Sequence, residues 1–125
     1  MIDYNEIVKN LKKEEVKHLL LDLGAEEVIE KDNCFITNTI CHNIEGGSLK
    51  LYYYFDRKIF VCYTECNDAF NIFTLIEKVK SLNGEEYNYY KARDYILNFL
   101  DYENIIVHEY KYNSITEKYK PTIHA

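Results

Sequence analysis

Four side chains between residues 41 and 66 are of the types that bind a transition metal. Cys41 and His42 are adjacent, and Cys62 and Cys66 enclose the three residues YTE. A structural zinc ion takes four thiolate or imidazole ligands, commonly as two pairs with two to four residues between paired cysteines. The second pair fits this spacing. The pattern therefore predicts a tetrahedral Zn2+ site with the ligands Cys41, His42, Cys62 and Cys66.

The first pair is less regular, because adjacent residues on an ideal strand point to opposite faces. Cys41 and His42 can bind one ion only if the strand ends there, and the loop at 43–48 with its two glycines permits this. Cys34 is a reserve ligand. It lies seven residues before Cys41, and a small buried hydrophobe is its more ordinary role. Whether Cys34 replaces Cys41 or His42 stays open.

Four protein ligands leave no coordination position for water, so the predicted site is structural rather than hydrolytic. A redox dithiol is a poorer interpretation of Cys62 and Cys66, since the spacing is not C-x-x-C and no βαβ pattern precedes it. His18, His108 and His124 are interpreted as surface residues.

The elements that must position these ligands follow from hydrophobic periodicity. Residues 3–23 predict one or two short helices, and Gly24 suits the position after a helix. Residues 34–40 predict a strand. Residues 49–55 alternate between two faces, with Lys50, Tyr52 and Tyr54 on one of them. A polar turn at 56–58 leads to a returning strand at 59–62, which completes a three-stranded sheet.

The sequence after the second cysteine pair predicts helices. Asp68 can cap a helix that ends at Asn83-Gly84. The buried face of this helix is expected to contain Ile72, Phe73, Leu75, Ile76 and Val79. A second helix is predicted over roughly 85–100, and residues 104–110 predict a last strand or an extended segment. The fold class is therefore α+β: a zinc ribbon with a small antiparallel sheet flanked by helices.

Composition bounds the chain as a whole. Its 125 residues include one Pro and four Gly, which favours one domain over 1–103 with a C-terminal extension or linker at 104–125. Neither an export signal nor a membrane-spanning run is visible, so we expect a cytoplasmic protein with reduced or metal-bound cysteines. The net charge of −6 argues against non-specific duplex binding. Residues 48–63 nevertheless carry three cations and one acid.

The order of these features resembles a known family. A strand, a Cys-His turn, the LYYY strand, IFVCYTEC and then DAFNIFTLI resemble the N-terminal zinc-binding domain of bacterial-type DNA primases, especially those of phages of Gram-positive bacteria. The resemblance covers about residues 5–100. This chain departs from the family in its adjacent Cys41-His42, in its C-x3-C spacing, and in Asn67, where a glycine is usual.

The resemblance implies a module that contacts the single-stranded DNA template for primer initiation, with the replicative helicase or a primase catalytic domain as further partners. Base stacking on aromatic rings flanked by cations suits this role. The candidate nucleic-acid-binding residues are Lys50, Tyr52, Tyr54, Arg57 and Lys58. A tyrosine stripe on a small sheet also commonly packs against a helix, so both interpretations stay open.

The sequence leaves the enzymatic question open. Primases polymerise in a separate domain with paired acidic motifs, and these 125 residues contain no such centre. The chain is either part of a primase or a stand-alone relative. The alternative function is a zinc-stabilised protein-interaction factor that acts on a replication protein, which the acidic net charge favours.

Overall fold

The computed structural model describes residues 4–114, with side chains for residues 4–101. Within these residues the chain forms four helices and one five-stranded antiparallel sheet. The predicted α+β class is confirmed. By its contacts the chain divides into two units, the first ending at Arg93 and the second beginning at Asp94.

The sheet has its strands in sequence order, β1-β2-β3-β4-β5, each paired antiparallel to the next. The strands are β1 (Val28–Glu30), β2 (Cys34–Thr37), β3 (Leu51–Tyr54), β4 (Ile59–Cys62) and β5 (Asp68–Phe70). Sequence patterns predicted β2, β3 and β4 but missed the two edge strands. The predicted number of three strands was therefore wrong, because the sheet has five. Each edge strand has only three residues, too few for an alternating pattern, and β5 begins with Asp, which is disfavoured in strands.

The pairing register gives the sheet two unlike faces. One row consists of directly paired aromatic side chains that lie in the core: Phe35, Tyr53, Phe60 and Phe70. Tyr52 and Tyr54 alternate with the buried residues of β3 and are only partly buried on the opposite face. The predicted separation of the β3 side chains onto two faces therefore holds.

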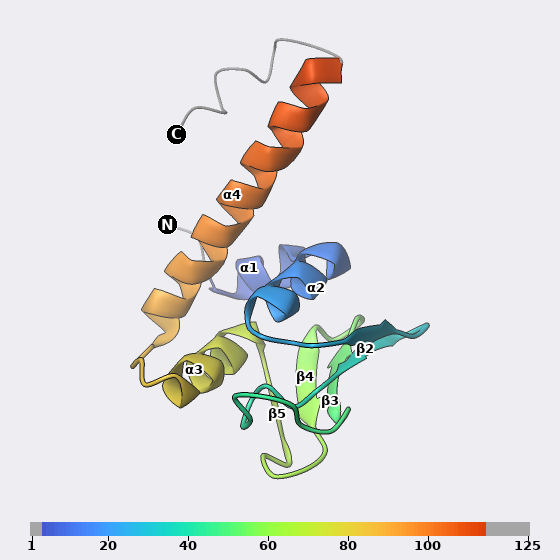
Figure 1. Cartoon of the computed structure of the whole chain (residues 1–125), viewed down its shortest axis with the longest axis vertical. Coiled ribbons are helices and arrows are strands. Elements are labelled where there is room, and N and C mark those ends of the chain that lie inside the picture. The colour runs from blue at the N-terminus through green and yellow to red at the C-terminus, as the bar shows by residue number, and fades with distance from the viewer. Residues whose placement is uncertain (1–3, 115–125) are drawn as a thin grey trace. The chain divides into compact units, whose positions relative to one another are not determined.

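Three short helices belong to the first unit: α1 (Tyr4–Asn10), α2 (Lys13–Asp22) and α3 (Ile72–Leu82). Figure 1 shows α2 above the sheet and α3 beside β5, and α2 contacts β1 while α3 contacts β4 and β5. All five residues predicted for the buried face of α3 are buried. Asn71, not Asp68, caps α3: its side-chain oxygen accepts a hydrogen bond from the Thr74 amide at 3.1 Å, because Asp68 is used in β5.

The last helix, α4 (Tyr89–Ser114), is much longer than predicted. Residues 104–110 are helical rather than extended, because continuing a helix avoids the cost of nucleation and can override the strand propensity of Ile and Val. The predicted domain boundary at residue 103 falls inside this helix and stays a prediction. Residues 115–125 of the predicted linker lie outside the described residues.

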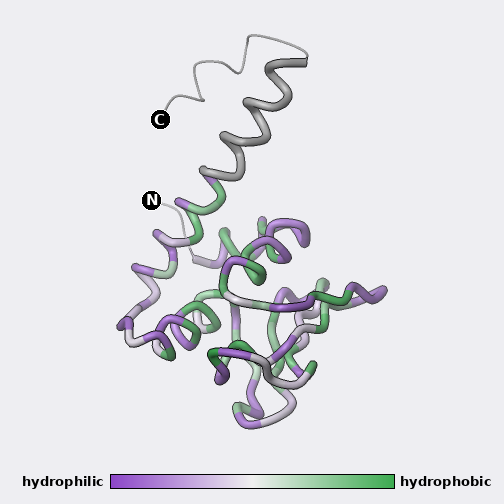
Figure 2. The backbone as a smooth tube through the Cα atoms, in the orientation of Figure 1, coloured by the Kyte–Doolittle hydropathy of each residue, from purple (hydrophilic) through white to green (hydrophobic). Residues whose placement is uncertain are grey.

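Hydrophilic residues gather at the turn between β1 and β2, which Figure 2 shows as a purple tip.

Among the described helices, none combines the length and the apolar character that crossing a membrane requires.

Candidate metal centre

The structure brings the four predicted ligands together. One ligand atom from each of Cys41, His42, Cys62 and Cys66 lies within 4.8 Å of all the others. In a tetrahedral site with Zn–S bonds of about 2.3 Å, two sulfurs are about 3.8 Å apart. Side-chain shifts of about 1 Å therefore suffice to bind zinc. Cys34 is outside this cluster and is buried in β2 opposite Tyr54. This position fits the role of a small buried hydrophobic residue that the sequence suggested for it.

A backbone turn lets the adjacent Cys41 and His42 face one point. Strand β2 ends at Thr37, and the carbonyl of Thr39 then accepts hydrogen bonds from the amides of His42 and Asn43, at 3.2 and 3.1 Å. Residues 39–43 therefore form a hydrogen-bonded turn rather than an extended strand. Neighbouring side chains in such a turn no longer point to opposite sides, which meets the condition that the sequence imposed on this pair.

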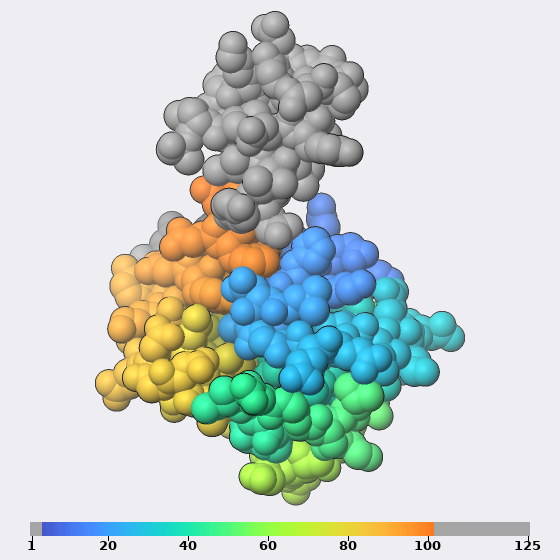
Figure 3. Space-filling view, viewed as in Figure 1, coloured from blue at the N-terminus to red at the C-terminus, as the bar shows by residue number. Residues whose placement is uncertain are grey.

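The loop after His42 is held by the buried Asn38 and the half-buried Asn43. Asn38 donates from Nδ2 to the carbonyl of Gly46 at 2.8 Å, and its Oδ1 accepts from the Glu26 amide at 2.9 Å. Asn43 donates to the hydroxyl of Thr39 at 2.8 Å. Figure 3 shows this loop, in dark green, at the surface beside α3, in yellow. The first ligand turn thus has a hydrogen-bonded support of its own.

Gly47 closes this support tightly. A Cβ atom at this position would lie 2.5 Å from Thr39 Oγ1 and 3.1 Å from Asn43 Nδ2, and the backbone φ is +94°. Only glycine combines this conformation with so close an approach. The sequence had indicated that the loop is permissive; the structure shows that at Gly47 it is also closely packed.

The second ligand turn is the loop between β4 and β5. Cys62 is the last residue of β4 and is paired with Asp68 at the start of β5. The chain reverses between them through Cys66 and Asn67, whose φ is +44°. Asn tolerates this left-handed conformation better than most residues, so the glycine that is usual in the resembling family is not required here.

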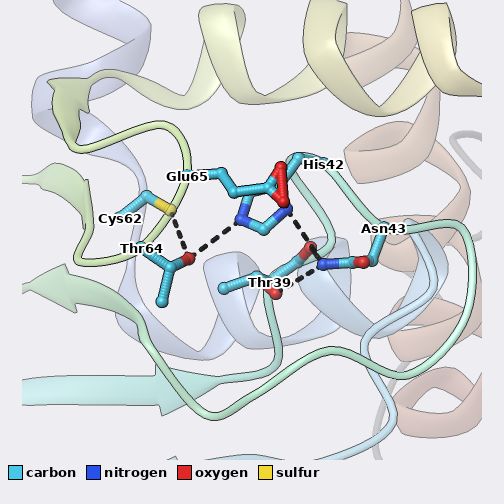
Figure 4. Close-up of polar contacts among 6 residues, drawn as sticks. All are labelled: Thr39, His42, Asn43, Cys62, Thr64 and Glu65. Atoms are coloured by element: carbon cyan, nitrogen blue, oxygen red, sulfur yellow. Dashed lines mark hydrogen bonds and ion pairs between the residues drawn. The ribbon is translucent and has the colours of Figure 1, made fainter.

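Thr64 connects the two ligand turns, as Figure 4 shows. Its hydroxyl lies 3.0 Å from His42 Nε2 and 3.4 Å from Cys62 Sγ. On the other side of the imidazole ring, His42 Nδ1 lies 3.0 Å from Asn43 Nδ2 and 3.9 Å from a carboxylate oxygen of Glu65. Sequence reasoning missed Thr64, although its position between two predicted ligands was the available signal.

The thiols differ in their readiness to ionise. Burial raises the pKa of Cys41, and hydrogen bonds with Cys66 and Cys62 raise it further. Burial also acts to raise the pKa of Cys62, but hydrogen bonds from the hydroxyl and amide of Thr64 and from the amide of Cys66 outweigh it and lower this pKa to about 6. Burial raises the pKa of Cys66. One thiolate is therefore favoured, and each further one would be repelled by it.

A divalent cation removes the repulsion between thiolates, because it deprotonates the thiols that coordinate it and neutralises their charges. Soft thiolates with one imidazole favour zinc over oxygen-seeking ions such as Mg2+ or Ca2+. A cleft of about 460 Å³ reaches Cys41 and His42 and gives an ion a route to the site. The cleft is completed by Glu77, Lys78, Ser81, Leu82, Glu86 and Tyr87. The donor set, its spacing and its access all fit Zn2+.

Comparison with known proteins gives one informative match. Over 95 residues, or 75% of this chain, the sequence is 39% identical to the SPbeta prophage-derived uncharacterized protein YorJ of Bacillus subtilis (strain 168). The chain is thus distantly homologous to a prophage-derived protein and spans a quarter (25%) of its length. No family model matches the sequence, and no solved structure matches it significantly.

The predicted nucleic-acid-binding residues lie in and around the β3–β4 hairpin. The rings of Tyr52 and Tyr54 stack with centroids 6.0 Å apart, and Lys50 and Arg57 are exposed. Lys58 is half-buried, and its ammonium group donates to the carbonyl of Leu11 at 2.7 Å. A role for Lys58 in binding therefore requires the loss of this hydrogen bond, and the role of all five residues stays a prediction.

Proposed function

We propose that this chain is the zinc-ribbon, DNA-binding module of a phage-type DNA primase and that it contacts the single-stranded template during primer initiation. The observation that carries the proposal is the convergence of three thiols and one imidazole within 4.8 Å, from two turns in the order found in the resembling domain. The homology to a prophage-derived protein four times as long as the match supports a phage origin and agrees with a module of a larger protein.

The ion has a structural role in this proposal. Its four protein ligands leave no position for a catalytic water. Binding to such sites supplies roughly 10–16 kcal/mol of apparent free energy at neutral pH, and here it would join the turn after β2 to the loop after β4. Polymerisation would take place on another domain of the primase, which is also a candidate partner together with the replicative helicase.

The proposed template surface is the partly buried face of β3 with its flanking cations. Tyr52 and Tyr54 offer ring faces for unpaired bases, and Lys50 and Arg57 are placed to neutralise phosphates. This local excess of positive charge lies within a chain of net charge −6. Binding would therefore be confined to a short stretch of a single strand, without general affinity for a duplex.

Two measurements test the proposal. Elemental analysis of the purified protein should find one zinc per chain. Cys62→Ser should lose the metal and fold poorly, whereas Cys34→Ser, which alters a buried thiol outside the cluster, should retain it. Fluorescence anisotropy at low salt should then show binding of a labelled oligothymidylate by the zinc-loaded protein. A native protein without metal would refute the metal site, and a zinc-loaded protein without affinity for the oligonucleotide would refute the template role.

A second function is favoured by the overall acidity. A net charge of −6 suits a zinc-stabilised factor that binds a basic surface of a replication protein. Such a factor would contain the same metal but would show no salt-dependent affinity for single-stranded DNA. The anisotropy measurement therefore separates the two functions.

A further inference from the structure

A third tyrosine adjoins Tyr52 and Tyr54 on the partly buried face of the sheet. Tyr63 is 51% exposed, and its ring meets that of Tyr52 edge-on, with centroids 5.0 Å apart and an interplanar angle of 87°. Its hydroxyl lies 2.8 Å from the hydroxyl of Tyr54. We call these three residues, Tyr52, Tyr54 and Tyr63, the tyrosine cluster. Two members come from β3, and the third comes from outside the strands.

The third member belongs to the metal turn. Tyr63 stands directly between Cys62, a ligand, and Thr64, whose hydroxyl contacts both Cys62 and His42. The amide of Tyr63 donates to the carbonyl of Lys50 at 3.0 Å. The backbone that places the Tyr63 ring is therefore the same backbone that places a ligand sulfur, and it also contacts the residue that supplies a cation of the proposed template surface.

We propose that the tyrosine cluster is a stacking site for unpaired nucleobases that is assembled by the metal, with Tyr63 as the coupling residue. This inference rests on the proposed function and extends it to regulation of the same surface. Zinc bound by Cys62 and Cys66 fixes the turn and so holds the Tyr63 ring against Tyr52. Without zinc the turn keeps only its hydrogen bonds to Cys41 and His42, and the Tyr63 ring is held less firmly against Tyr52.

Single-stranded nucleic acid suits this surface better than other ligands. Aromatic rings accept any base through its π-face, and two cations lie next to them in sequence, Lys50 directly before β3 and Arg57 in the β3–β4 turn. The rings contact one another through edges and hydroxyl groups, which holds them in fixed positions before binding. A preformed site avoids part of the ordering cost of association.

Coupling between two sites is reciprocal. If zinc strengthens oligonucleotide binding by some factor, the oligonucleotide must strengthen zinc binding by the same factor. One stacked base is worth about 5- to 150-fold in affinity. We therefore expect a coupling factor in this range, and we expect it to disappear when the Tyr63 ring is removed while the metal stays bound.

The first arm of the test measures binding of fluorescein-labelled dT16 by anisotropy at low salt, with zinc-loaded full-length protein. Tyr63→Ala should lower the affinity by about 5- to 150-fold, with zinc content unchanged. Tyr90→Ala is the matched control, because Tyr90 is also an exposed tyrosine, at 58%, but belongs to α4. The control should bind dT16 like the wild type. Equal affinities of the two variants would overturn the proposal.

The second arm measures zinc affinity by competition with a chromogenic chelator, with and without saturating dT16. The wild type should bind zinc more tightly with dT16, and Tyr63→Ala should show no such gain. A gain that persists in Tyr63→Ala would overturn the coupling role. If Tyr63→Ala loses zinc, Tyr63→Leu repeats both arms with a side chain that retains bulk. Loss of zinc from both variants would show that Tyr63 serves the metal turn alone, and the proposal would be wrong.

The outcomes separate this inference from the proposed function. A wild-type protein that contains zinc but does not bind dT16 overturns both. A wild-type protein that binds dT16 with the same affinity as Tyr63→Ala overturns only the inference and leaves the template role with Tyr52 and Tyr54.

Discussion

Thr64→Val tests whether the metal centre depends on a hydroxyl that is not itself a ligand. The substitution replaces an oxygen by a methyl group at nearly constant volume. It removes the contacts of Thr64 with Cys62 Sγ at 3.4 Å and with His42 Nε2 at 3.0 Å. Since burial alone would raise the pKa of Cys62, and hydrogen bonds lower it to about 6, removing one of them should raise this pKa and weaken zinc binding.

The size of the effect follows from proton competition. At pH 7 a thiol with a pKa of about 6 is about 90% ionised, and one with the ordinary pKa of about 8.5 is about 3% ionised. Complete loss of the lowered pKa would thus cost about 30-fold in apparent affinity. The amides of Thr64 and Cys66 still donate in the variant. We therefore expect about 10-fold weaker zinc binding, in the range usual for groups that support a ligand.

The pH dependence distinguishes this cause from a general loss of structure. The ratio of the zinc affinities of wild type and Thr64→Val should be largest below pH 6, where both thiols are mostly protonated, and should fall toward one above pH 9, where the thiol ionises in both proteins. Chelator competition at pH 7 and 9 measures it. Thr64→Ser should restore tight binding. Thr74→Val, which removes a hydroxyl 3.0 Å from that of Tyr89 in the first unit, should leave it unchanged. Equal zinc affinity of Thr64→Val and wild type at pH 7 would refute the reasoning.

Three further predictions concern the supports of the two sites. Gly47→Ala should lower the free energy of unfolding by about 1–3 kcal/mol in urea titrations, since its Cβ would lie 2.5 Å from a side-chain oxygen. Gly46 also has a positive φ, but no atom lies within 4 Å of its Cβ position. Gly46→Ala should therefore lower the free energy of unfolding by less. The hydrogen bond with Tyr63 raises the pKa of Tyr54 to about 12, and NMR titration of labelled tyrosine should show this pKa falling toward about 10 in Tyr63→Phe. Lys50→Ala should reduce the salt dependence of dT16 affinity by about 0.7 in the log–log slope, if Lys50 contacts a phosphate.

The clustering of the four candidate metal ligands was predictable because their spacing is a local property. Only three residues separate Cys62 from Cys66, and the pair was predicted to lie between the end of a strand and the start of a helix, where the chain must turn. Cys41 and His42 required a further condition, that the strand ends before them. Whether it did depended on the hydrogen bonds of Thr39 and Asn38 within the irregular segment that follows β2, and such bonds leave no periodic signal.

The edge strands and the end of α4 were not predictable in the same way. Strands β1 and β5 have three residues each and are strands only because a neighbouring strand offers its free backbone groups for pairing. The helical conformation of residues 104–110 continues from the residues before them. Local propensity is weak in both cases, and the adjoining structure decides.

The tyrosine cluster shows the same distinction within a functional surface. Alternation along β3 placed Tyr52 and Tyr54 on one face, and the structure has them there. Tyr63 follows the last residue of β4, where alternation no longer specifies direction, so its side chain is placed by the course of the metal turn. A surface that draws one of its rings from such a turn cannot be assembled from strand patterns. For the same reason its geometry should respond to what the turn binds.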